Sequence, residues 1–286
     1  MIARVSAITG NTLTDLTRQK VFYFLLIFAL ILIASSVFLA RFTFQQEFQI
    51  LKDVSLGAMS IFSSLLAILA AARLIPQDIE DRTIYTILAK PLPRFEYVLG
   101  KLCGILLLLA LSLVVMSTLF LTVLYSREQT VLHETMRQMA QAPRDQIDDA
   151  LRTVRDSALN TNLFPGIVII YLKACLLGAL TLLVSTVATT NIFTVVVMVF
   201  VYFIGQFEAI AREYWLEQYS SGWLTHGVLA MVALVFPDLQ AFNLVDDVVA
   251  GAAIGGALFL KTALLALFYT TTYAILAIFA FCGKEL

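Results

Sequence analysis

Residues 102–125 read LCGILLLLALSLVVMSTLFLTVLY, a run of 24 residues with no charged side chain. About 20 consecutive apolar residues are enough for a helix to cross the hydrocarbon core of a bilayer. The run predicts a transmembrane helix, because a helix satisfies its backbone polar groups internally where no water can do so.

The composition of the whole chain points the same way. Of its 286 residues, 60% are apolar and 14% are charged, and the mean hydropathy is +0.89. Soluble domains carry about 25% charged residues. The net charge of −1 gives no reason to expect a nucleic acid as partner. We therefore expect a single all-α integral membrane domain over residues 1–286, with the lipid bilayer as its main surroundings.

Apolar stretches and polar breaks divide the chain into about six spans. Residues 2–20 are amphipathic and predict a helix lying in the membrane interface. Residues 126–163 are charged and predict two short extracytoplasmic helices, broken at Pro143. Residues 223–245 are too short and too interrupted for an ordinary span, so they predict a re-entrant segment, with a seventh span as the alternative. The six expected spans cover residues 21–40, 54–75, 102–125, 164–187, 192–211 and 256–281.

The most informative polar stretch is residues 79–101, IEDRTIYTILAKPLPRFEYVLGK. Pro76 suits the first turn of a helix, and the acidic residues after it suit the positive end of the helix dipole. Pro91 and Pro93 would end that helix. The stretch therefore predicts a short amphipathic helix over residues 79–90, joined directly to the third span. The Lys and Arg residues near it favour the cytoplasmic side, with both termini also cytoplasmic.

This stretch resembles the signature of permease subunits of the type-2 (ABC-2) class of ABC exporters. The resemblance is strongest to the subclass grouped with multicopper-enzyme maturation and sodium export, and the layout of spans is also similar. The residues that carry the resemblance are Glu80, Arg82, Thr83, Leu88, Pro91, Arg94, Gly100 and Lys101. The resemblance implies that these residues, together with Tyr85, couple the chain to an ATPase.

The resemblance implies a division of labour between chains. A separate cytoplasmic ABC ATPase would bind ATP and Mg²⁺ and push on the helix at 79–90. A second permease copy or a sister permease would complete the transporter, in a bacterial cell membrane. The residues themselves agree on one point: no GxxxxGK[ST] phosphate loop is present, since Gly100-Lys101 is followed by Leu102. We therefore expect no cofactor on this chain and no enzymatic activity of its own.

Two other features bear on function. Lys173 and Glu208 fall inside expected spans, where ionisable groups are costly and usually face a protein interior. We expect that they could pair, with lysine snorkelling as the alternative. Gly251 and Gly255 form a GxxxG pattern, which favours close helix packing.

Two alternatives to a transporter subunit stay open. A membrane scaffold could use residues 126–163 to contact a partner outside the membrane. A membrane enzyme is the other, but His133 and His226 lie in no recognisable catalytic or metal-binding spacing. The sequence does not specify the transported substrate.

Overall fold

The computed structural model describes residues 2–40, 47–81, 93–140, 143–158, 162–218, 237–243, 248–249 and 255–283, without the side chains of 208–218. In these residues the fold is helical, with no strand. The elements are α1 (Ile2–Thr17), α2 (Lys20–Ala40), α3 (Glu47–Glu80), α5 (Arg94–Gln138), α6 (Arg144–Ala158), α7 (Leu163–Val187), α8 (Asn191–Gln218), the short 3₁₀ helix η1 (Gln240–Phe242) and α11 (Gly256–Cys282).

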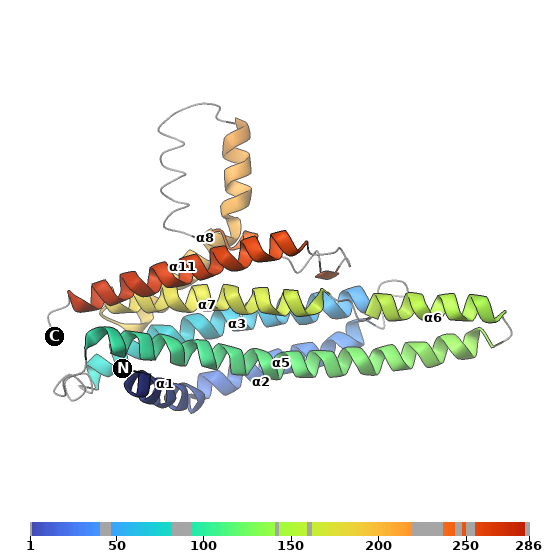
Figure 1. The fold of residues 1–286 in the computed structure, drawn as a ribbon, viewed down its shortest axis with the longest axis horizontal. Coiled ribbons are helices and arrows are strands. Elements are labelled where there is room, and N and C mark those ends of the chain that lie inside the picture. The colour runs from blue at the N-terminus through green and yellow to red at the C-terminus, as the bar shows by residue number, and fades with distance from the viewer. Residues whose placement is uncertain are drawn as a thin grey trace.

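Five of these helices are long and apolar enough to cross a membrane: α2, α3, α5, α7 and α11. They run along the long axis of the molecule as a bundle (Figure 1). In α8 the described apolar stretch is shorter, Asn191–Phe207. The coarse prediction of an all-helical protein with several spans is therefore confirmed.

Small side chains allow α3 to lie at the centre of the bundle. In their most apolar stretches, 72% of α3 is buried, against 28% of α2 and of α11. The packed face of α3 carries alanine and serine, including Ala58, Ser63, Ala67 and Ala71, which let neighbouring helices approach closely. The outer helices expose large apolar residues instead, such as Phe24 on α2 and Phe268 on α11, as expected for surfaces that contact lipid.

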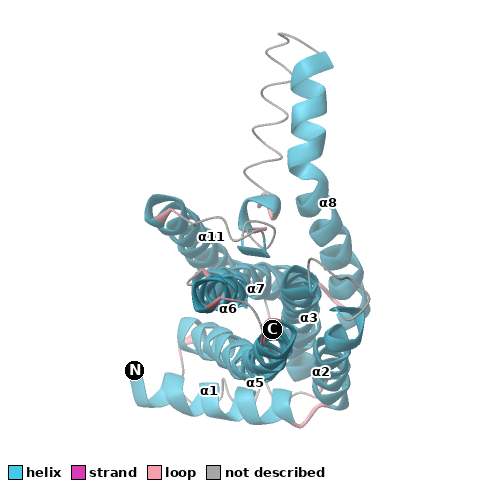
Figure 2. Cartoon of the chain, turned by 90° about the vertical axis from the view of Figure 1, so that its right-hand side faces the viewer, coloured by secondary structure: helices cyan, strands magenta, loops and turns pink. Residues whose placement is uncertain are grey.

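Helix α1 lies across the bundle axis. Viewed along the bundle, α3, α5 and α7 are seen nearly end-on, while α1 runs across the page beneath α5 and α2 (Figure 2). The start of α1 and the end of α11 lie at the same end of the bundle (Figure 1). The second half of α8 stands away from the bundle in both views (Figures 1 and 2).

Several helix boundaries differ from those expected. Helix α3 begins at Glu47, inside the expected polar connection, and continues through Pro76 to Glu80. The prediction that Pro76 starts a new helix is therefore wrong. A proline removes only one intrahelical hydrogen bond, and a helix held on several sides by neighbours tolerates that loss. The rest of the expected coupling helix, residues 82–90, lies outside the described residues.

Helix α5 is much longer than the expected span over 102–125. Its 45 residues reach about 67 Å at 1.5 Å per residue, against about 30 Å for a hydrocarbon core. The prediction that a separate short helix opens the segment 126–163 is therefore wrong, because α5 continues into this segment. The expected break at Pro143 is confirmed, since α6 starts at Arg144 and packs back along α5. Most of the expected re-entrant segment, 223–245, lies outside the described residues.

Candidate functional site

The best-connected polar cluster ties three helices together at the end of the bundle where α1 lies. The carboxylate of Asp78, in the last turns of α3, forms an ion pair with Lys101 of α5 at 2.7 Å. The hydroxyl of Tyr97, one turn before Lys101, donates to the same carboxylate oxygen. The side chain of Lys101 is 6% exposed and that of Asp78 18%. This burial makes the pair a fixed link between α3 and α5.

The same cluster holds the end of α11. The ring of Tyr97 stacks on Phe281, with centroids 5.3 Å apart and an interplanar angle of 24°. Arg94 Nη1 donates to the Cys282 carbonyl oxygen at 2.8 Å, and the Phe281 carbonyl oxygen lies 3.5 Å away. A guanidinium at the carboxyl end of a helix satisfies free carbonyl groups and complements the helix dipole. We call Asp78, Arg94, Tyr97, Lys101 and Phe281 the anchor.

Helix α1 closes over the next turns of α5. A Cβ built at Gly100 would lie 2.6 Å from Ile8 Cγ2, and one at Gly104 would lie 2.6 Å from Thr12 Cγ2. The Thr9 hydroxyl lies 3.2 Å from the Gly100 carbonyl oxygen, in addition to its bond to Val5. Only glycine at these two positions permits this approach, so Gly100 and Gly104 form the small-residue surface of the crossing.

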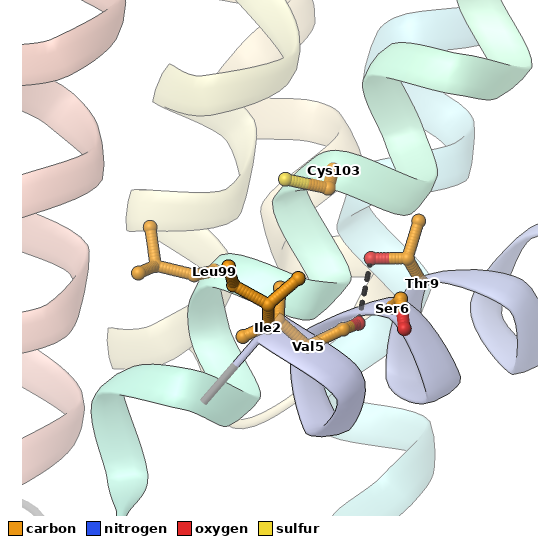
Figure 3. Close-up of a pocket in the computed structure, with 6 residues that line it drawn as sticks. All are labelled: Ile2, Val5, Ser6, Thr9, Leu99 and Cys103. Atoms are coloured by element: carbon orange, nitrogen blue, oxygen red, sulfur yellow. Dashed lines mark hydrogen bonds between the residues drawn. The ribbon is translucent and has the colours of Figure 1, made fainter.

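An apolar crevice of about 370 Å³ lies between the start of α1 and α5. It is lined by Ile2, Val5, Ser6, Thr9, Leu99 and Cys103 (Figure 3). The crevice continues the α1–α5 contact toward the outer surface of the bundle. Its apolar lining fits a helix that lies against lipid.

The structure places only part of the expected coupling residues. Arg94 and Lys101 belong to the anchor, and Gly100 lies under α1. Glu80 is exposed at the end of α3. Any coupling role of Gly100 or Lys101 would therefore be to position helices, because both are buried. Outside the described residues lie Arg82, Thr83, Tyr85, Leu88 and Pro91.

Lys173 lies in the interior of the bundle. It is 2% exposed, and its Nζ lies 5.8 Å from the centroid of the Tyr202 ring of α8. A buried cation–π contact contributes about 2 kcal/mol, whereas burying an ammonium costs several kcal/mol. The ring therefore offsets only part of the cost. The expected pairing with Glu208 stays a prediction, because the side chain of Glu208 lies outside the described residues.

A second set of polar contacts holds the opposite end of the bundle. Arg127 of α5 pairs with Glu47 of α3 at 2.6 Å. The Lys52 ammonium donates to the Ser157 carbonyl oxygen at the end of α6, also at 2.6 Å. A polar cavity of about 290 Å³ lies beside them and includes Glu134 and Gln138. These contacts fix the α5–α6 hairpin to α3.

The described residues contain no group of three or more His, Cys, Asp or Glu side chains that could hold a metal ion. No protein-family model and no curated protein matches this chain. The candidate site therefore depends on its geometry and on the sequence signature. Tyr97 and Phe281 belong to no motif and were not predicted from the sequence. The sequence also did not indicate that Asp78 pairs with Lys101.

Proposed function

We propose that this chain is the membrane-spanning subunit of an ATP-driven exporter of the type-2 class, whose ATPase is a separate cytoplasmic chain. The observation that carries the proposal is the anchor: the two helices on either side of the signature segment are locked to each other by Asp78 and Lys101. A docking segment needs firmly joined helices on both sides of it, because force applied to a loosely held loop would move only the loop.

The anchor would transmit force from the docking segment to the neighbouring helices. Helix α3 ends at Glu80 and α5 begins at Arg94, so residues 81–93 connect two helices that are bonded at their base. Stacking of Tyr97 on Phe281 extends the connection to α11. The glycine surface of α5 extends it to α1. A partner binding at 79–90 would therefore move four helix ends together.

The remaining topology follows from this orientation. The end with the anchor would face the cytoplasm, with both chain termini, and α1 would lie in the interface because it runs across the bundle axis (Figure 2). The α5–α6 hairpin would be extracytoplasmic. Helix α8 would complete six spans, and a second copy or a sister permease would complete the transporter in the bacterial cell membrane.

The test is co-purification of an ATPase with the tagged chain from its native membranes in mild detergent, followed by an ATPase assay. The variant Glu80→Ala/Arg82→Ala removes two charges from the docking segment. Glu80 is exposed, and Arg82 belongs to the signature. The matched control is Asp149→Ala/Arg152→Ala, which removes one exposed acidic and one exposed basic side chain from α6, at the other end of the bundle. We expect an ATPase to co-purify with the native chain and the control, and to be lost or uncoupled in the first variant.

Two results would count against the proposal. One is the absence of any nucleotide-hydrolysing partner in several mild detergents. The other is equal loss of the partner in both variants, which would indicate general destabilisation and not docking.

A scaffold function is the second candidate, and the length of the α5–α6 hairpin favours it. Helix α6 carries exposed charges, including Asp148, Arg152 and Arg155. The variant Asp148→Ala/Arg152→Ala/Arg155→Ala should release an extracytoplasmic partner but preserve ATPase stimulation if the hairpin is a docking surface. The opposite pattern would exclude this role.

A further inference from the structure

Lys173 has the position of a charge in the interior of the bundle and not of a snorkelling lysine. It lies 10 residues from the start of α7 and 14 from its end, about 15 Å and 21 Å along the helix. Its burial at 2% exposure shows that the side chain points into the bundle and not toward lipid. A lysine that snorkels keeps its ammonium in water near a helix end.

The surroundings of Lys173 supply polar but uncharged groups. Tyr202 of α8 presents its ring to the ammonium, and its hydroxyl interacts with Ser64 of α3. Ser64 also donates to the Ser60 carbonyl oxygen. Among the described residues, no carboxylate oxygen lies within 4.0 Å of the Lys173 ammonium. Among the described side chains, the place where α3, α7 and α8 meet therefore offers the Lys173 ammonium no anionic partner.

We infer that Lys173 binds the anionic headgroup of an amphipathic substrate, a phosphate or carboxylate on an alkyl chain. The inference rests on the proposed function, since it names the substrate class that the transporter would move. An ammonium in the membrane interior is stabilised best by an anion that arrives with its own apolar surface. Phe203 of α8 is exposed and its ring centroid lies 6.0 Å from that of Tyr202, so an apolar surface for the alkyl chain adjoins the residue that contacts Lys173.

Glu208 is the competing counter-ion. It lies six residues beyond Tyr202 on α8, about 9 Å further along the helix than the residue that contacts Lys173. If Glu208 nevertheless neutralises Lys173, a substrate anion would find the charge already occupied. The experiment therefore includes a variant of each residue.

The experiment is native mass spectrometry of the detergent-solubilised chain, which needs no ATPase and so can fail separately from the proposed function. The probes are dodecyl phosphate and the matched cation dodecylammonium. The variants are Lys173→Met, which keeps the length of the side chain without the charge, Lys173→Arg, which keeps the charge, and Glu208→Gln. Monodisperse elution in size-exclusion chromatography verifies that each variant is folded.

We expect the native chain to bind dodecyl phosphate in preference to dodecylammonium. Lys173→Met should weaken binding of the phosphate by about tenfold to a hundredfold, the range for one charge-assisted contact. Lys173→Arg and Glu208→Gln should bind it within a fewfold of the native chain. Equal binding by the native chain and Lys173→Met would overturn the inference, and so would binding that appears only in Glu208→Gln, which would show an internal ion pair.

Discussion

Asp78 and Lys101 form a largely buried 2.7 Å ion pair that joins the last turns of α3 to the second turn of α5. Tyr97 bonds to the same carboxylate and stacks on Phe281, so one acidic side chain organises contacts among three helices. The predictions below test this arrangement and the contacts that surround it.

Removing one partner of the ion pair should destabilise the chain strongly. Lys101→Met removes the ammonium that lies 2.7 Å from the partly buried Asp78 carboxylate, and breaking a buried ion pair costs about 3–5 kcal/mol. Thermal unfolding in detergent, followed by the loss of monodisperse protein, measures the effect. The double variant Asp78→Leu/Lys101→Met should recover much of the stability, because an apolar pair replaces the charges. A double variant no better than Lys101→Met would contradict this account.

Adding a methyl group at Gly100 should displace α1. The new Cβ would lie 2.6 Å from Ile8, and overpacking of this kind costs about 1–3 kcal/mol. Gly100→Ala should therefore lower the unfolding midpoint, and Gly100→Ala/Ile8→Ala should restore part of it. Gly57→Ala is the matched control, since a Cβ built there meets none of the described neighbouring atoms within 4 Å. We expect the control to be neutral or to stabilise α3 by about 0.5–1 kcal/mol.

Chemical labelling of cysteine tests the orientation of the bundle. Cys282 is exposed at the end of α11, whereas Cys175 is buried and Cys103 half-buried. In a Cys103→Ser/Cys175→Ser background, a membrane-impermeant maleimide should label Cys282 in inside-out vesicles and not in intact cells. Asp149→Cys on α6, placed in a cysteine-free background, should show the reverse. If both positions were labelled from the same side, the end of α11 and helix α6 could not lie on opposite sides of the membrane.

The contact between Lys52 and α6 should control the mobility of the hairpin. The Lys52 ammonium is bonded to the Ser157 carbonyl oxygen, and a hydrogen bond from a charged group contributes about 1.5–3 kcal/mol. Lys52→Met should therefore increase amide hydrogen exchange over residues 144–158. Arg152→Ala, which changes an exposed side chain of α6 itself, serves as control and should leave that exchange nearly unchanged. Unchanged exchange in Lys52→Met would show that α6 is held mainly by its contacts with α5.

The positions of the apolar helices could largely be predicted, but not all of their ends: five of the six expected spans coincide with long apolar helices. Residues 164–187 and 256–281 match α7 and α11 within a residue at each end. Polar residues flank both ends of α7 and follow the end of α11, whereas the pair Gly255-Gly256 marks the start of α11. Helices α3 and α5 continue far beyond their apolar cores. Hydropathy identifies where lipid surrounds a helix, whereas these extensions are held by protein contacts such as Glu47 with Arg127.

Pattern alone did not indicate which glycines lie at close helix contacts. The packing expected from the GxxxG pattern at 251 and 255 stays a prediction, because Gly251 lies outside the described residues, and a Cβ built at Gly255 meets no described atom within 4 Å. Gly100 and Gly104, which have the same spacing, do bring α5 close to α1. Spacing indicates that a helix has a smooth surface, but it does not indicate which helix covers it.

The sequence by itself determined that this is a helical membrane protein without a phosphate loop, and it singled out Arg94, Gly100 and Lys101. Those properties follow from local composition and short motifs. Only the tertiary structure decided that Lys101 pairs with Asp78, that Arg94 binds the end of α11 and that Lys173 faces the ring of Tyr202. Each of these contacts joins different helices, and its geometry depends on how the whole bundle packs, which no local pattern records.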